Sequence, residues 1–121
     1  MRAARARPLI ALDEEAISVK AGNRPSASIC RIPWSTVASV VAFKRDCVTV
    51  DLICLAIQSD SGIALELNEE MPGWSALVIA IPEKLPGCPK FEEWFESVAF
   101  PGFGTNSRIL FQKSGNPVNT T

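Results

Sequence analysis

The sequence predicts an α+β fold in which about six strands are followed by two helices and a last strand. Residues 8–70 are rich in short apolar runs and β-branched residues, separated by turn residues. Between residues 74 and 98 the apolar positions instead recur at helical spacing. We therefore expect a mostly antiparallel sheet, or a partly open barrel of six to seven strands, with two C-terminal helices packed on one face or end of it.

The first strands are predicted on either side of an acidic turn. "PLIAL" (8–12) and "AISVK" (16–20) flank Asp13–Glu15, a pattern that favours a hairpin. Residues 21–28 contain Gly, Asn and Pro, which punctuate loops, and are expected to form one. "ICRIPW" (29–34) then resumes an extended pattern. Because its proline cannot donate to a ladder, this strand is expected to be an edge strand or to end near the proline.

The middle of the chain carries the strongest strand patterns. Residues 35–44 are rich in β-branched residues and predict a strand, and "KRD" (44–46) is expected to be a charged connection. Residues 48–58 are apolar except for Thr49 and Asp51, which is typical of a central strand covered on both faces. A buried acid in such a strand needs a partner, and Lys44 or Arg45 across the hairpin could supply it.

An alternating strand then gives way to a helix at "EEMPGW" (69–74). In residues 63–70 the expected inward positions are Ile63, Leu65 and Leu67, and the outward ones are Ala64, Glu66 and Asn68. The apolar face of the first helix comprises Trp74, Leu77, Val78 and Ile81. Pro72 and Gly73 are expected to introduce this helix, and Pro82 to end or kink it.

A second helix is predicted to start at Pro89, since proline suits the first helical turn. Its apolar face consists of Phe91, Trp94, Phe95 and Val98, with Glu92, Glu93 and Glu96 on the other face. The aromatic set formed by Trp74, Phe91, Trp94 and Phe95 is expected to be core rather than a ligand cage. "RILFQK" (108–113) is predicted to be the last strand and to return to the sheet.

The totals fit a single domain over residues 1–121. We expect an ordered core at about 8–113, a frayed basic N-terminus at 1–7 and a polar tail at 114–121. The formal charge of −1 gives no general attraction to nucleic acid or to anionic membrane. No apolar run suits a signal peptide or a membrane span, so a cytoplasmic protein with reduced cysteines is predicted.

The residue types argue against common kinds of catalysis. The chain has neither His nor Tyr, so the usual general bases and the Ser-His or Cys-His nucleophile pairs are absent. The four cysteines form no CxxC pair, and we expect no metal site and no cofactor. Cys88 could have a depressed pKa at a helix N-terminus, but it lacks a histidine partner. A non-enzymatic protein is therefore favoured.

Two candidate sites remain, both built from carboxylates. The favoured one is an acidic rim that would contact a basic surface of another protein, and it consists of Glu66, Glu69, Glu70, Glu92, Glu93 and Glu96. The alternative is a small hydrolase with Asp46, Asp51 and Glu69 in its pocket. A concave pocket joining two of these acids would favour the hydrolase, and a convex rim would favour the binding module. The predicted structural anchors are Trp34, Asp51, Trp74 and Trp94.

Four stretches carry a resemblance to known proteins. "WSTVASVVAFKRD" (34–46), "DLICLAI" (51–57), "EEMPGW" (69–74) and "LPG" (85–87) resemble a set of small uncharacterised bacterial proteins. The succession of strands, one of them opened by a tryptophan, also looks like bacterial pleckstrin-homology-like domains. The resemblance implies a fold and a bacterial cytosolic location and no chemistry. We therefore expect a cytosolic binding or scaffold module, for instance a toxin-neutralising protein, that binds a protein partner and could form a homo-oligomer.

Overall fold

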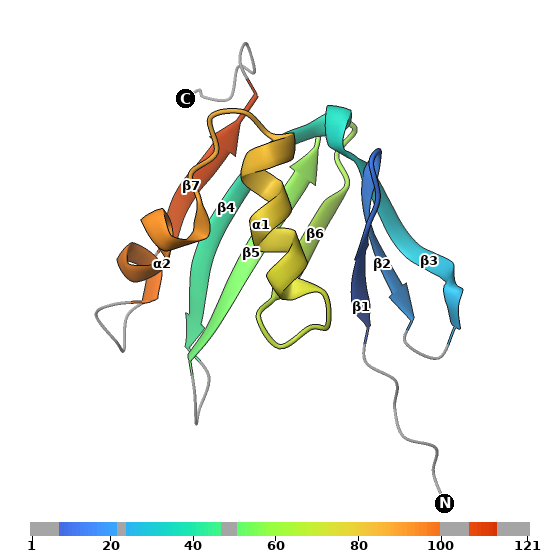
Figure 1. The fold of residues 1–121 in the computed structure, drawn as a ribbon, viewed down its shortest axis with the longest axis horizontal. Helices are drawn as coiled ribbons and strands as arrows, with labels where there is room; N and C mark the ends of the chain where they lie inside the picture. Colours follow the sequence, from blue (N-terminus) through green and yellow to red (C-terminus); the bar gives the residue numbers. More distant parts are fainter. Residues whose placement is uncertain (1–7, 22–23, 47–50, 100–106, 114–121) are drawn as a thin grey trace, which may run out of the picture.

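A computed structural model describes residues 8–21, 24–46, 51–99 and 107–113 (Figure 1). Its seven strands form two antiparallel sheets. The first sheet has the order β1-β2-β3, with bounds Leu9–Leu12, Ala16–Ala21 and Arg24–Pro33. The second has the order β6-β5-β4-β7, with bounds Ala64–Asn68, Asp51–Ser59, Val37–Asp46 and Ser107–Gln112. The helices are α1 (Trp74–Lys84) and α2 (Phe91–Ala99).

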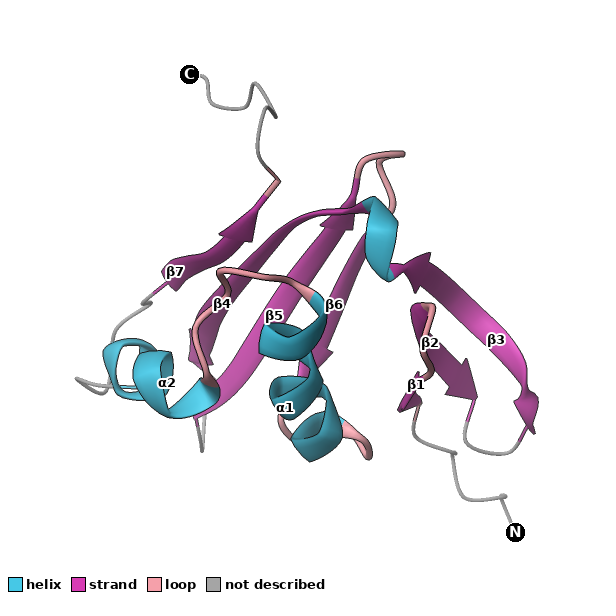
Figure 2. Ribbon diagram, turned by 45° about the horizontal axis from the view of Figure 1, so that its top comes forward, coloured by secondary structure: helices cyan, strands magenta, loops and turns pink. Residues whose placement is uncertain are grey.

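The predicted α+β class and the predicted order of elements are confirmed. The strands do not form one continuous sheet, and the two sheets are not closed into a barrel. The chain passes from one sheet to the other at the 3-10 turn Trp34–Thr36, which Figure 2 shows between β3 and β4. Figure 1 shows α1 and α2 in front of the four-stranded sheet. The face of that sheet away from the helices carries half-buried residues such as Val41 and Ala56.

The first hairpin has the predicted form. One carboxylate oxygen of Asp13, Oδ1, accepts hydrogen bonds from the amides of Glu15 (2.7 Å) and Ala16 (2.8 Å). These two bonds lower the pKa of Asp13, because they stabilise the charged carboxylate. The predicted loop at 21–28 is partly wrong, since β3 begins at Arg24. The strand β3 ends at Pro33, as predicted, and it is an edge strand.

The central strand of the larger sheet is β5, as predicted. Ile53, Leu55 and Ile57 are buried, whereas Gln58 on the opposite face is exposed. The prediction of burial on both faces therefore holds only in part. The predicted connection at 44–46 is wrong, because these residues continue β4. Lys44 is only 1% exposed, and its Nζ donates to the carbonyl of Ala99 at the end of α2 (3.4 Å).

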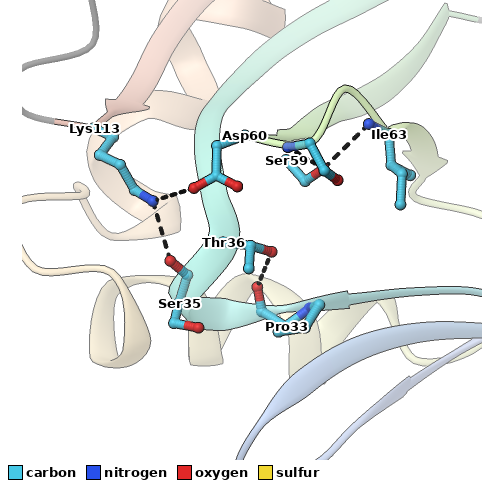
Figure 3. Close-up of polar contacts among 8 residues, drawn as sticks. Pro33, Ser35, Thr36, Ser59, Asp60, Ile63 and Lys113 are labelled. Atoms are coloured by element: carbon cyan, nitrogen blue, oxygen red, sulfur yellow. Dashed lines mark hydrogen bonds and ion pairs between the residues drawn. The ribbon is translucent and has the colours of Figure 1, made fainter.

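Polar contacts fix the corner between the sheets, as Figure 3 shows. Lys113 Nζ binds Asp60 Oδ2 (2.8 Å) and the carbonyl of Ser35 in the 3-10 turn (3.1 Å). The amide of Asp60 donates to the carbonyl of Thr36 (2.8 Å). Trp34 is buried here, and its Nε1 donates to the carbonyl of Asp13 (3.1 Å). The corner thus joins both sheets and buries Trp34, whose role as an anchor stays a prediction.

The stretch 69–74 is a corner that packs against the smaller sheet. Helix α1 begins at Trp74, and its N-cap is Gly73 with a left-handed φ of 95°. Pro72 and Gly73 thus introduce the helix, as predicted. The carbonyl of Pro72 accepts a hydrogen bond from the amide of Ile10 (2.8 Å). A Cβ on Gly73 would lie 2.2 Å from the carbonyl oxygen of Ile10, so only glycine fits.

The apolar face predicted for α1 is confirmed, because Trp74, Leu77, Val78 and Ile81 are all buried. Ile63, predicted to face inward, is 43% exposed and precedes β6, whereas Leu67 is fully buried. Pro82 does not end α1, which continues to Lys84. The buried faces of both helices belong to one hydrophobic core with the inner faces of the two sheets.

The second helix begins later than predicted, at Phe91 rather than Pro89. The amide of Lys90 donates to Glu93 Oε1 (3.2 Å), and the amide of Glu93 donates to the carbonyl of Lys90 (2.9 Å). This reciprocal pair resembles a capping box and fixes the helix start. Trp94 is buried, and it contacts Phe91 edge-to-face at a centroid distance of 5.0 Å.

Candidate functional site

Three of the predicted rim acids lie on β6 and the corner that follows it. Glu66 Oε2 binds Arg45 Nη2 at 2.6 Å, and this pair raises the pKa of the Arg45 guanidinium. Glu69 Oε2 accepts a hydrogen bond from the amide of Ile53 (2.9 Å) and so extends the ladder between β5 and β6. The backbone amide of Glu70 donates to the side-chain oxygen of Asn68 (2.9 Å). Glu66 and Glu69 thus have local structural partners.

The other three predicted acids lie on α2, at a different place in the fold. This helix packs against β4 and β7, whereas Glu66 is on β6 at the opposite edge of the four-stranded sheet (Figure 1). Glu93 caps the helix, and Glu92 and Glu96 are exposed. The six acids therefore form two separate groups rather than one continuous rim.

A groove lies between the two helices and includes one acid of the second group. Its volume is about 310 Å³. The lining residues come from α1 and from the start of α2, and they are Val78, Ile79, Pro82, Glu83, Lys90, Phe91 and Glu92. This volume is at the lower end of the range of ligand pockets, about 300–1,000 Å³. The groove therefore suits one or two inserted side chains better than a large cofactor.

The lining of the groove combines apolar and charged residues. Ile79 is 63% exposed and points away from the core side of α1, while Phe91 is half-buried. Glu83, Glu92 and Lys90 are exposed, and together they carry one more negative than positive charge. Sequence reasoning identified Glu92 but missed Ile79 and Glu83. The available signal was an isoleucine off the buried face of α1, followed four residues later by an acid.

A second hollow, of about 450 Å³, lies beside Trp34 and is open and polar. Its charged residues already interact with one another. Arg31 lies 4.0 Å from Asp13 and 3.9 Å from Glu15, and Glu14 binds Lys84 at 2.9 Å. Since each of these charged side chains has an oppositely charged neighbour within the protein, we prefer the groove between the helices as the candidate site.

The acids of the predicted hydrolase are only partly placed. Asp46 and Asp51 are directly opposite each other at the end of the β4–β5 ladder, and both side chains lie outside the described part of the structure. Asp51 is the first residue of β5 rather than a break within it. Arg45, one of its two predicted partners, binds Glu66. Neither hollow described above includes Glu69. The hydrolase and the pairing of Asp51 stay predictions.

The described cysteines, Cys30, Cys54 and Cys88, are reduced, and Cys47 lies outside the described residues. Burial raises the pKa of the Cys88 thiol to about 11, so the depressed pKa considered from the sequence is wrong. Among the described residues no group of three or more His, Cys, Asp or Glu side chains could hold a metal ion. Neither of the two described helices is long and apolar enough to cross a bilayer.

Comparison of the chain with protein-family models, curated proteins and solved structures finds no match. The predicted relationship to small bacterial proteins and to pleckstrin-homology-like domains therefore stays a prediction.

Proposed function

We propose that this protein is a non-enzymatic binding module that holds a basic, partly apolar segment of another protein in the groove between α1 and α2. The observation that carries the proposal is a groove whose lining joins apolar residues, among them Ile79 (63% exposed), with two acids. A concave apolar surface rimmed by charged residues is typical of a protein-binding site.

The apolar and charged parts of the groove have different roles in the proposed binding. Ile79, Pro82 and Phe91 would bury an apolar side chain of the partner and supply most of the affinity. Glu83 and Glu92 would attract basic residues and so increase the association rate, an effect that salt weakens. The groove lies between two helices that share one core, so its walls are fixed before binding.

The proposal can be tested with peptides displayed on phage. Peptides are selected on the immobilised protein, and the dissociation constant of the strongest is measured for the wild type and for Ile79→Asp. We expect at least a tenfold loss of affinity for this variant, because it places a charge on the apolar wall.

The matched control is Ile109→Asp. Ile109 is exposed to nearly the same extent (60%) but lies on β7, outside the groove lining. This variant should bind within about twofold of the wild type. Selected peptides that bind wild type and Ile79→Asp equally would refute the proposed site.

Several finer features of the function are part of the same proposal. A cytosolic location in a bacterium and a fold related to pleckstrin-homology-like domains rest on the resemblance of the sequence. A toxin-neutralising or scaffold role is a particular form of the proposed binding role, and the groove supports the binding role alone. Glu93 and Glu96, the other two acids on α2, would add to the attraction for a basic partner.

A further inference from the structure

We infer that the groove between α1 and α2 receives an arginine side chain of the partner protein, an inference that rests on the proposed binding function. An arginine combines a long apolar stem with a planar cation that carries five hydrogen-bond donors. The groove offers matching groups for each of these parts.

The charge of the groove fits one added cation. Glu83 and Glu92 contribute two carboxylates, and Lys90 contributes one ammonium group. One guanidinium would make this set neutral.

The wall formed by α1 has an extra hydrogen-bond acceptor. Pro82 lies inside α1 and has no amide hydrogen, so it cannot donate to the carbonyl of Val78 four residues earlier. Both residues line the groove. We therefore expect the carbonyl of Val78 to offer a neutral acceptor beside the two carboxylates, and a guanidinium has enough donors to bind all three.

The wall formed by α2 has an aromatic ring. Phe91 lines the groove, and its position is fixed by contacts with Trp94 (5.0 Å) and Phe95 (4.9 Å). Guanidinium groups pack favourably on aromatic rings and are less strongly hydrated than ammonium groups. The same chain has such a contact elsewhere, since the guanidinium carbon of Arg45 lies 5.5 Å from the centre of the Phe43 ring. The ring of Phe91 therefore favours arginine over lysine.

The inference is tested with two small probes, N-acetyl-arginine amide and N-acetyl-lysine amide. Each is titrated into isotope-labelled protein, and the amide chemical shifts are followed by NMR. We expect saturable shifts at Val78, Ile79, Glu83 and Phe91, with at least threefold tighter binding of the arginine probe. Shifts that are absent from these residues, or equal binding of the two probes, would overturn the inference.

Three variants separate the expected contributions. Glu92→Gln should weaken the arginine probe at least threefold, whereas Glu15→Gln, which removes the same charge outside the groove, should not. Phe91→Leu keeps an apolar wall without an aromatic ring, so it should abolish the preference for arginine over lysine. An unchanged preference in Phe91→Leu would contradict the proposed contact with the ring.

The result also distinguishes this inference from the proposed function. If selected peptides lose affinity for Ile79→Asp but the probes bind equally, the groove is a binding site without specificity for arginine. If neither the peptides nor the arginine probe depends on the groove, the proposed function and the inference are both wrong.

Discussion

Replacement of Gly73 by alanine should destabilise the protein more than the same replacement at a glycine that has a left-handed conformation but open space around it. The φ of Gly73 is 95°, and an alanine there costs about 1–2 kcal/mol. The new Cβ would also lie 2.2 Å from the carbonyl oxygen of Ile10, so the corner and β1 must separate. Loss of the hydrogen bond from Ile10 to Pro72 would add about 0.5–1.5 kcal/mol.

The matched control for this prediction is Gly62→Ala. Gly62 has nearly the same φ, 96°, but nothing lies within 4 Å of the position its Cβ would occupy. We therefore expect a loss of about 1.5–3.5 kcal/mol for Gly73→Ala and about 1–2 kcal/mol for Gly62→Ala. Urea unfolding of the three proteins, followed by tryptophan fluorescence, gives both values. If the two variants were equally stable, the close packing of the corner on β1 would be refuted.

Three further predictions concern stability. Trp74→Ala should cost about 3–5 kcal/mol in urea unfolding, because it opens a cavity under α1, and an unchanged stability would show that the tryptophan is not an anchor. The pKa of Asp13 is lowered in the folded state, so the contribution of its carboxylate to stability is present above pH 3.8 and is lost as the pH falls through the folded pKa. The difference in unfolding free energy between wild type and Asp13→Ala should therefore shrink below about pH 4. A difference that stays constant with pH would contradict this. Burial raises the pKa of the Cys88 thiol from its ordinary value of 9.0 to about 11 in the folded state. Wild type should therefore lose stability relative to Cys88→Ala as the pH rises from 9.0 to about 11. Stability curves of the two proteins that run parallel over this pH range would place the thiol in solvent.

The sequence predicted the order of elements and the main buried faces because these depend on local periodicity. The face of α1 from Trp74 to Ile81 and the central place of β5 are examples. The start of the second helix was less well predicted, since Pro89 suits a first turn but instead precedes it. Lys44 was expected in a turn because charge usually indicates exposure, yet tertiary packing buries it under the end of α2.

The candidate site could be predicted only in part. The acids of α2 were identified because they lie on the polar face of the predicted helix. A groove, however, depends on how two helices lie relative to each other, and periodicity does not specify that. Glu83 and Glu92 are separated by nine positions in the chain and meet only because α1 and α2 share one groove. The expected rim failed for the same reason, because β6 and α2 lie at opposite edges of the sheet.

The central claim is that the groove between α1 and α2 is the surface that binds a partner. Hydrogen exchange of the protein with and without a selected peptide tests it most directly, since exchange reports where binding protects the backbone. The account predicts slower exchange at residues 78–84 and 90–95, with little change along β6 and β7. Protection confined to β6, to β7 or to the hollow beside Trp34 would contradict the claim.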